Sequence, residues 1–424
     1  MVDRPANPTQ VVYPLTGTVP RMSPKPRVYT TRVVGLFMAT AGYFSVAGLS
    51  FPVLPRLVER EFDGSKADIG LVFGLLAVGM LFARPLAGVM SDRYGRRPLM
   101  IVGSLIVAVA QIGHIFAAET GHLWVLFVVR VLTGAGSSAM YLALATTATE
   151  LPSAEHRDRV FAAFSTMVLV GFAIGQTSGE WVMQEWGFQP TYLMATGFAL
   201  LTTMVSIALP ETRPDNVVPA ARMREVFHPV AARVGLVNLM VFTAFMGFNA
   251  FIADYAEEFG MEEVRWLLLL YSGTTMAMRL VQGRVMARLP RRTLASIAQS
   301  FVIAGVLILA TAQGTGQLYL GAFVFALGLA WNVPLMILIA VDSADDADRS
   351  KVVATVTTFG DIANSVGTLA LGFVAESFGY AGMYFLVGAL VFAGLILLRS
   401  PFLSGLEGMG LSRSEPVAPA ASRT

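Results

Sequence analysis

The sequence contains no cysteine, and only 14% of its 424 residues are charged. Without cysteine, the chain can form neither disulfide bonds nor thiolate metal sites. Its formal net charge of +2 is too small to indicate a nucleic-acid partner. Soluble proteins average about 25% charged residues, whereas this chain is 55% hydrophobic with a mean hydropathy of +0.64. An aqueous fold could not bury so much apolar surface, so we expect the lipid bilayer to be the solvent.

The sequence also lacks the G-x-x-x-x-G-K-[ST] loop that cradles nucleotide phosphates. ATP is therefore not expected to power any transport, and an electrochemical gradient is the remaining source of work. We find no enzyme signature and no soluble domain for a catalytic site, and so expect no enzymatic activity, cofactor or metal. Lysine is scarce: Lys25, Lys66 and Lys351 are the only lysines among 30 basic residues, which indicates a GC-rich bacterial gene.

Apolar runs long enough to cross a bilayer recur along the chain. A spanning helix needs roughly 20 mostly apolar residues. Backbone groups in hydrocarbon must be bonded internally, so these runs are expected to be helices. The expected spans are 32–54, 66–90, 98–118, 122–147, 160–184, 190–210, 231–255, 263–289, 293–312, 317–341, 350–375 and 381–400. The expected fold class is therefore all-α, a polytopic membrane protein with twelve transmembrane helices.

Arginine gathers in the loops on one side of the membrane. The loops assigned to that side carry Arg93, Arg96, Arg97, Arg157, Arg159, Arg213, Arg222, Arg224, Arg288, Arg291, Arg292, Arg349 and Lys351. The opposite loops are acidic, with Glu59, Glu61, Asp63, Asp68, Glu257, Glu258, Glu262 and Glu263. Because basic residues favour cytoplasmic loops, we expect a multi-pass cell-membrane protein with both termini in the cytoplasm.

The two halves of the chain repeat one another. Three residues, Arg84, Gly88 and Arg96, recur 195 positions later as Arg279, Gly283 and Arg291. A second set recurs at an offset of 192, pairing Gly136, Gly175, Gly187 and Tyr192 with Gly328, Gly367, Gly379 and Tyr384. This pattern indicates two six-helix bundles with the same orientation, related by an axis along the membrane normal.

These observations divide the chain into five segments. Residues 1–30 are rich in proline and are expected to be a disordered cytoplasmic tail. The N-terminal bundle is expected over 31–210, and a cytoplasmic linker over 211–230. The C-terminal bundle follows over 231–400, and a second cytoplasmic tail over 401–424.

Residues 88–97 read Gly-Val-Met-Ser-Asp-Arg-Tyr-Gly-Arg-Arg and directly follow a long apolar run. This G-x-x-x-D-R-x-G-R-R pattern resembles the loop between the second and third helices of major facilitator superfamily (MFS) transporters. A positive-inside bias explains the arginines, but not the glycines or the aspartate. The resemblance covers roughly residues 30–400. It implies a gating role for Gly88, Asp92, Arg93, Gly95, Arg96 and Arg97.

The second copy of this loop is altered. Ala287 replaces the aspartate and Pro290 replaces the second glycine, so only the first loop keeps the acidic charge. In the family, the loop aspartate faces the start of the eleventh helix when the protein is open to the outside. The resemblance therefore implies that Asp92 faces Ser350 and Lys351 in that state.

An ionisable residue inside a membrane costs roughly 2.5–3.5 kcal/mol on insertion scales. Arg84 and Arg279 are expected one turn before their helices end, where they can snorkel to the interface as partners at the inner gate. Arg130 begins the run Arg-Val-Leu-Thr-Gly-Ala-Gly, which resembles the family's fourth-helix signature and implies a part in proton coupling. The alternative is a structural arginine that bonds to backbone carbonyls.

Asp361 is the only acid expected near the membrane midplane, and we expect it to carry the coupling proton. The alternative is an aspartate that only joins helices by hydrogen bonds, with Asn364 or a second-helix residue as its partner. By contrast, Asp254 and Glu180 are expected to be solvated residues at the outer rim. His114 is expected to be a satisfied packing residue.

The resemblance implies a central cavity lined by the first, fourth, seventh and tenth helices. Candidate substrate-binding residues there are Tyr43, Ser138, Tyr141, Phe245, Asn249, Trp331 and Asn332. Such an aromatic lining with few fixed charges suits amphipathic solutes better than sugars or phosphates. The fifth helix has glycines spaced every four residues for close packing. However, it reads Gly175-Gln176 where exporters of the family have glycine-proline.

We therefore expect a secondary transporter that exports a small amphipathic drug or metabolite by alternating access, coupled to protons. The expected partners are this solute, protons and the lipid bilayer, with the chain acting as a monomer. One alternative is a proton symporter or a uniporter that imports a small nutrient. A non-transporting receptor or scaffold is more remote, because such a protein needs no buried acid like Asp361.

Overall fold

The computed structural model of the protein describes residues 28–213, 228–261, 263–286, 288–342 and 349–400. These residues form helices and no strand, which confirms the all-α fold class. Nearly all of the two expected tails, most of the expected linker, and Ala287 lie outside the described residues.

Each half of the chain contributes one set of long helices. The first half contains α1 (Thr31–Phe62), α2 (Lys66–Tyr94), α3 (Arg96–Thr120), α4 (Leu123–Glu150), the short η1 (Ala154–His156), α5 (Arg157–Trp186) and α6 (Phe188–Ala208). The second half contains α7 (Pro229–Glu257), α8 (Val264–Met286), α9 (Arg291–Ala310), α10 (Thr315–Asp342), α11 (Arg349–Ile362), the π-helical η4 (Ala363–Gly367) and α12 (Thr368–Arg399). By length and composition, ten helices within the described ranges could cross a membrane.

The boundary between the last two expected spans lies inside α12, because this helix contains the end of the first span and nearly all of the second. The expected helix 350–375 consists of α11, η4 and the first part of α12. The chain then turns within α12 at Gly379, whose φ of 71° and ψ of 174° are not helical. Gly187, its repeat equivalent, has φ 83° and ψ −172° between α5 and α6. Both turns need a backbone conformation that glycine adopts most readily.

The turn between α1 and α2 shows how short the connections are. Asp63 ends α1 in a left-handed conformation, with φ of 49°. Ser65 then begins α2 with a capping box, in which its hydroxyl accepts the backbone N–H of Asp68 at 3.2 Å. The Asp68 carboxylate in return accepts the backbone N–H of Ser65 at 2.9 Å. Part of the acidity expected in this loop therefore serves to cap a helix.

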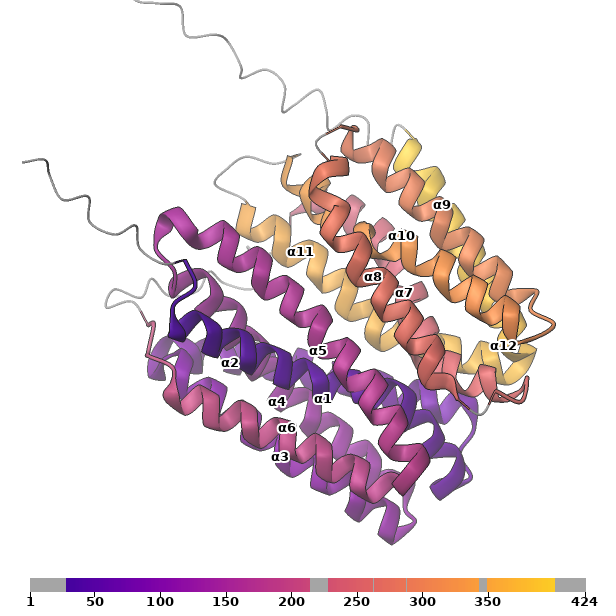
Figure 1. Ribbon diagram of the computed structural model, residues 1–424, viewed down its shortest axis with the longest axis horizontal. Helices are drawn as coiled ribbons and strands as arrows, with labels where there is room; N and C mark the ends of the chain where they lie inside the picture. Colours follow the sequence, from indigo (N-terminus) through magenta and orange to yellow (C-terminus); the bar gives the residue numbers. More distant parts are fainter. Residues whose placement is uncertain (1–27, 214–227, 262, 287, 343–348, 401–424) are drawn as a thin grey trace, which may run out of the picture.

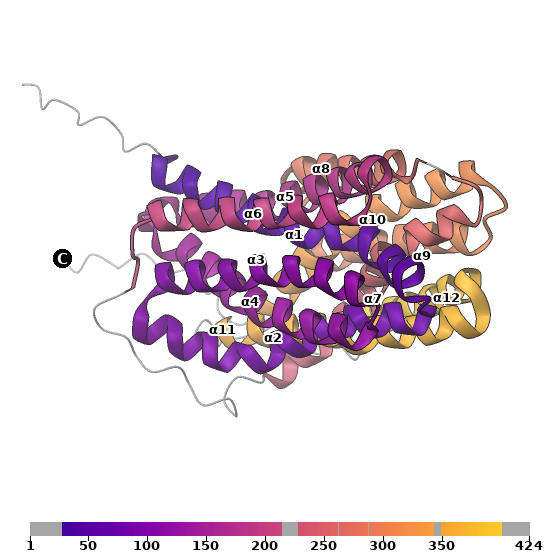
Figure 2. The same ribbon diagram turned by 90° about the horizontal axis from the view of Figure 1, so that it is seen from below.

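The helices form two bundles that lie side by side (Figure 1), α1–α6 in indigo to magenta and α7–α12 in salmon to yellow. Seen from below, the helices of both bundles run in roughly the same direction (Figure 2). The bundles meet where α5 packs on α8, α1 on α7, and α2 on η4 and α12. We call the end where α1 begins and α12 ends the terminal end, and the other the opposite end.

Equivalent contacts in the two bundles support the internal repeat. Arg96, the first residue of α3, pairs with Glu150, the last residue of α4. Arg291, the first residue of α9, pairs in the same way with Asp342, the last residue of α10. The offsets between these pairs are the same 195 and 192 residues seen in the sequence. The two halves therefore share equivalent contacts between helices as well as equivalent residues.

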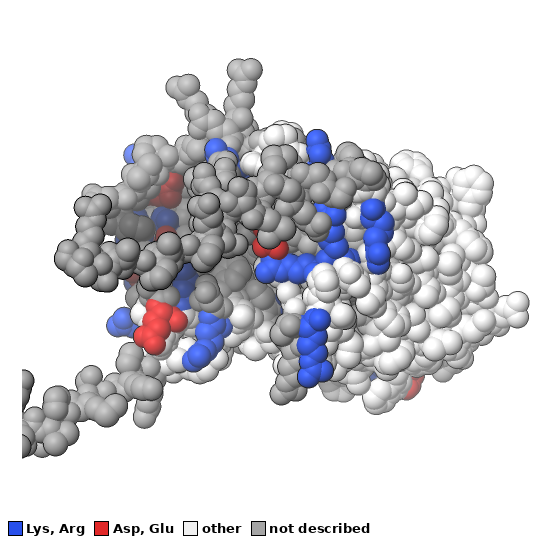
Figure 3. Space-filling model, turned by 90° about the horizontal axis from the view of Figure 1, so that it is seen from above, with Lys and Arg blue, Asp and Glu red and all other residues white. Residues whose placement is uncertain are grey.

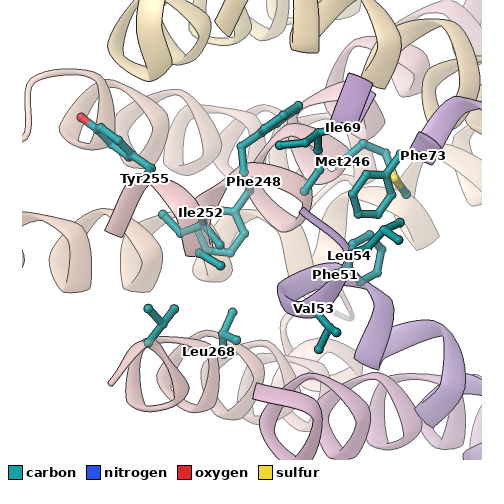
Figure 4. Packing of buried hydrophobic residues seen from close by; sticks show 14 of the residues in the cluster. Phe51, Val53, Leu54, Ile69, Phe73, Met246, Phe248, Ile252, Tyr255 and Leu268 are labelled. Carbon is teal, nitrogen blue, oxygen red and sulfur yellow. The ribbon is translucent and has the colours of Figure 1, made fainter. Parts of the chain in front are cut away.

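Buried apolar side chains form three clusters that reveal the state of the protein. The largest joins both bundles at the opposite end, from Val46–Val58 of α1 to Val241–Ala256 of α7. Figure 4 shows its centre, where Phe51 and Phe73 of the first bundle lie near Met246 of the second. At the terminal end each bundle has its own cluster instead. The two halves are thus packed together at the opposite end and separate toward the terminal end.

The outer surface is apolar, as expected for a protein in lipid. Figure 3 shows a wide surface without charged side chains over one part of the visible face, with Lys and Arg gathered elsewhere on it. Large apolar side chains such as Phe82, Leu280 and Phe378 are mostly exposed. An exposed apolar area of this extent marks a membrane-facing surface.

Candidate transport site and gates

The loop between α2 and α3 is held by charged contacts at the terminal end. Arg96 is buried and pairs with Glu150 at 2.9 Å. It also donates to the backbone oxygen of Ser91 at 3.0 Å and lies 3.4 Å from the carboxylate of Asp92. Arg96 therefore ties α2, α3 and α4 together. In this conformation Asp92 is engaged within its own loop.

Glu211, which follows α6, completes this loop from outside. Its carboxylate accepts the backbone N–H of Arg96 at 2.8 Å and of Arg97 at 3.1 Å, the first two residues of α3. It also accepts the backbone N–H groups of Thr212 and Arg213. Burial alone would raise the pKa of Glu211, but the four backbone donors lower it below the ordinary value of 4.5. The anion thus caps the N-terminus of α3.

The two glycines of the loop motif have different surroundings. Gly95 has φ of 105°, and an added Cβ would lie 2.8 Å from a carboxylate oxygen of Glu211. A Cβ on Gly88 would meet nothing within 4 Å outside its own helix. This conformation therefore requires Gly95, whereas Gly88 leaves an open surface on α2. The remaining motif residue, Arg93, accepts a hydrogen bond through its backbone oxygen from Arg213 at 2.7 Å.

Asp361 pairs with Arg84 across the two halves. Arg84 Nη1 lies 2.5 Å from Asp361 Oδ2, and the two side chains are 37% and 27% exposed. Tyr141 of α4 is 41% exposed and interacts electrostatically with both. The sequence left Asn364 or a second-helix residue as the partner of Asp361, and the partner is Arg84 of α2. Together, Asp361, Arg84 and Tyr141 form a polar site between the bundles.

Among the residues that the structure describes, the second-half equivalent of Arg84 makes no such contact between the halves. Arg279 donates to the backbone oxygen of Ala330 at 3.1 Å, within the C-terminal bundle. The neighbouring Trp331 donates its indole N–H to the backbone oxygen of Met278 at 2.8 Å. The expectation that both arginines snorkel to the interface is therefore not met by their contacts. Arg84 forms an ion pair between the two halves, whereas Arg279 donates a hydrogen bond from α8 to α10 within one half.

Arg130 lies inside the N-terminal bundle, away from Asp361. It is 1% exposed and donates through Nε to the backbone oxygen of Val72 at 3.1 Å. Its guanidinium lies 5.7 Å from the ring centre of Phe73. Among the described residues no acid forms an ion pair with it. This contact resembles the carbonyl-bonded alternative, and it connects α4 to α2.

The seven candidate substrate-binding residues divide by exposure. Tyr141, Phe245 and Trp331 are at least partly exposed. The other four are buried in this conformation: Tyr43, Ser138, Asn249 and Asn332. Of the predicted cavity lining, only the aromatic residues Tyr141, Phe245 and Trp331 are therefore accessible in this conformation.

A buried polar network that the sequence could not reveal crosses between the bundles. The Gln176 side chain of α5 donates to Asn249 Oδ1 of α7 at 2.6 Å. Its own carbonyl oxygen accepts the hydroxyl of Ser272 of α8 at 3.2 Å. Asn249 also donates to the backbone oxygen of Phe245 at 2.8 Å. The residue that stands in place of the exporter proline therefore links the halves, although its type alone gave no sign of these partners.

The expectation for Glu180 and Asp254 is wrong. Both were predicted to be solvated at the rim, yet they are 0% and 4% exposed. Glu180 forms an ion pair with the buried Arg56, which also pairs with Glu257 of the other half. The prediction failed because acids near a helix end reach water only when no neighbour covers them, and here the closed halves do.

Comparison with known proteins agrees with this architecture. The family profile described as Major Facilitator Superfamily matches residues 36–262 and again 234–418. The chain belongs to the Major Facilitator Superfamily. This MFS chain is thus a multi-pass membrane transporter for small molecules, and the resemblance found in the α2–α3 loop is confirmed.

Two bacterial MFS proteins illustrate the similarity in sequence. The multi-drug resistance efflux pump PmrA of Streptococcus pneumoniae is 26% identical over 352 residues, which cover 80% of this chain and 87% of PmrA. The MFS-type transporter YdeG of Bacillus subtilis is 27% identical over 381 residues, which cover 82% of this chain and 86% of YdeG.

Solved structures of the superfamily share the fold. The nucleoside transporter NupG superposes with a TM-score of 0.71 at 14% identity, over 86% of this chain and 98% of NupG. The human organic anion transporter MFSD10 superposes with a TM-score of 0.65 at 17% identity, over 89% of this chain and 100% of MFSD10. At such low identity the similarity concerns the fold alone.

Proposed function

We propose that this transporter exports a small amphipathic solute, a drug or a metabolite, in exchange for protons. The arginine-rich terminal end faces the cytoplasm in this proposal, because basic residues favour cytoplasmic loops. The acidic opposite end then faces outward. The separate apolar clusters at the terminal end support a state that is open toward the cytoplasm and ready to load solute.

The observation that carries the proposal is the Arg84–Asp361 pair between the halves. A partly exposed acid at this position can take up a proton, which removes its charge and weakens its attraction to Arg84. Because Arg84 belongs to one bundle and Asp361 to the other, that change alters the contact between bundles. Proton binding and the rocking movement of alternating access are thereby coupled.

The chemistry of the accessible cavity favours an amphipathic solute. Tyr141, Phe245 and Trp331 offer aromatic surface, and Asp361 and Arg84 supply one charge of each sign. Sugars and phosphates require more amide, carboxylate or paired cationic partners. The similarity to PmrA, a multi-drug resistance efflux pump, is in line with export of such compounds.

The α2–α3 loop is proposed to be the inner gate. Gly88 leaves α2 open on one side, where the start of α11 could approach when the terminal end closes. Asp92 would then face the N-terminus of α11, an interaction worth roughly 0.3–1 kcal/mol. Replacing Asp92 by asparagine should therefore shift the population toward the state open at the terminal end.

The test is transport into proteoliposomes under an imposed pH gradient, with ethidium as a fluorescent amphipathic probe. The unchanged protein should accumulate ethidium uphill. Asp361→Asn should abolish uphill accumulation while leaving exchange between equal ethidium pools measurable. Glu119→Gln, an exposed acid at the far end of α3, is the matched control. Near-normal uphill transport by Asp361→Asn would refute the coupling role.

The alternatives give different results in the same vesicles. An importer that uses protons would accumulate a nutrient along the direction of the proton gradient, and a uniporter would ignore the gradient. A receptor or scaffold would move none of the probes. Proton release on solute addition, screened across a set of small amphipathic compounds, would identify the substrate class.

A further inference from the structure

Four carboxyl groups gather around one arginine at the opposite end. Arg56 of α1 forms ion pairs with Glu180 of α5 and Glu257 of α7. Glu59 and Asp254 lie within electrostatic range of the same group. We call Glu59, Glu180, Asp254 and Glu257 the four-acid cluster. Its members come from both halves, so it lies across the contact that keeps this end closed.

Asp254 is the member without a partner. It is 4% exposed, and neither carboxylate oxygen accepts a hydrogen bond from any residue that the structure describes. The charged and titratable groups that face it are Arg56, Glu59, Glu180, Glu257, Tyr380 and Tyr384. The guanidinium of Arg56 that faces Asp254 is already shared by Glu180 and Glu257, and the exposed Arg60 pairs with Glu257 at 3.0 Å.

The protonation state of Asp254 follows from this environment. An ionised carboxylate buried without a partner is unfavourable by several kcal/mol, and such a group takes a proton instead. Three neighbouring acids add like-charge repulsion to that cost. Asp254 is therefore neutral while the opposite end is closed.

We propose that Asp254 is a proton-binding latch that holds the opposite end closed. The proton comes from the water on that side and returns to it when the halves separate and Asp254 becomes solvated. Since the closed state binds this proton and the open state releases it, low pH on that side favours closure. In the part of the chain that the structure describes, no group of His, Cys, Asp and Glu side chains suits a metal ion.

This latch is separate from the Arg84–Asp361 site. That pair lies between α2 and α11, is partly exposed, and has a partner. Asp254 lies on α7, is buried, and has none among the residues described. The latch requires neither a particular solute nor a direction of transport, so it can be tested without any transport assay.

The natural absence of cysteine makes a reporter simple to introduce. Val53 of α1 is 0% exposed in the cluster that joins the halves, so Val53→Cys should react with a membrane-impermeant maleimide only after the opposite end opens. His122→Cys, at an exposed position at the same end, corrects for the intrinsic pH dependence of thiol alkylation. Reconstituted protein is labelled from the opposite-end side between about pH 5 and about pH 8.

In the Val53→Cys background, corrected labelling should rise with pH, by up to about tenfold per unit for one linked proton. Asp254→Asn, which cannot ionise, should label slowly and without pH dependence. Glu119→Gln should respond like the unchanged background. Unaltered pH dependence in Asp254→Asn, or a response to sodium at fixed pH, would overturn the latch.

A second variant covers the case in which Asp254→Asn does not fold. Glu59→Gln removes one negative charge that faces Asp254, so the closed state loses the proton at lower pH, and the rise in labelling should level off at lower pH and at a smaller final value. An unchanged midpoint would contradict the proposal. Failure of ethidium transport would leave all of these labelling results unaffected, so the two proposals can be distinguished.

Discussion

The carboxylate of Glu211 accepts the backbone N–H of Arg96 at 2.8 Å, and so the segment after α6 caps the start of α3. The contact joins the last part of the N-terminal bundle to the α2–α3 loop. It places a negative charge at a helix N-terminus, where the helix dipole favours it. The loop motif is thus stabilised by a residue more than a hundred positions away in sequence.

Replacing Glu211 by glutamine should lower stability by about 0.3–1 kcal/mol, as for an exposed anion at a helix N-terminus. The pKa of Glu211 is lower in the folded state than its ordinary 4.5. Its contribution is therefore present above that value and is lost as pH falls through the folded-state pKa. Melting in detergent between about pH 3 and about pH 6 should show the difference between wild type and variant shrinking at low pH. An equal difference throughout would exclude the ionic cap.

Alanine at the two motif glycines should have contrasting effects. Gly95→Ala combines a φ of 105° with a clash against Glu211, so a loss of about 1–3 kcal/mol is expected. Gly88→Ala has free space in this conformation and should melt like wild type, while slowing transport if α11 must approach there. Each serves as the control for the other in melting and ethidium transport. Equal melting temperatures for both variants would count against this account.

Removing the Gln176 side chain should loosen the closed opposite end. Gln176→Ala leaves Asn249 and Ser272 without their bonds across the halves, at about 1–3 kcal/mol for groups left unsatisfied. Water can satisfy them only after the halves separate, so Val53→Cys labelling should rise roughly tenfold for each 1.4 kcal/mol. Ser165→Ala, at a partly exposed polar site on the same helix, is the control. No change in labelling would show that the network does not hold the halves.

Arg130 can be tested by separating its charge from its shape. Arg130→Lys keeps the charge but loses the planar donors that reach the Val72 carbonyl. We expect partial ethidium transport in Arg130→Lys, none in Arg130→Gln, and a lower melting temperature in both. Normal transport by Arg130→Gln across about pH 6 to 8, where coupled carboxyls would respond to a lost charge, would assign Arg130 to packing alone.

The apolar runs were sufficient to predict an all-α membrane fold, and the repeat agrees with equivalent contacts in the two bundles. The offsets that relate Arg96 to Arg291 also relate their partners Glu150 and Asp342, so sequence symmetry extended to contacts. The division between the spans 350–375 and 381–400 was predicted too, and the turn at Gly379 lies between them. Apolar runs and repeated residues can be recognised from neighbouring positions in the sequence, without knowing how distant segments pack.

The sites between the halves could not be predicted in the same way. Hydropathy treats Asp254 as a helix-end acid, whereas the packing of α12 and α1 on α7 leaves it buried. The substitution at Gln176 was visible, but its bonds to Asn249 and Ser272 depend on how two bundles meet. Sequence can name such residues, whereas their roles arise from contacts between distant segments.

The π-helical turn η4 gives the eleventh span an internal joint. Asp361 lies just before Ala363–Gly367, while the residues just after this turn pack closely on α2, with Gly70 and Gly372 in contact. A π-turn holds one residue more than an α-turn, which is about 100° of helical rotation. If the extra residue moved to another position along the helix, α11 would rotate about its own axis. The first part of α12, on the other side of η4, would stay fixed. Asp361 could then turn away from Arg84 without any loss of packing where the halves remain joined.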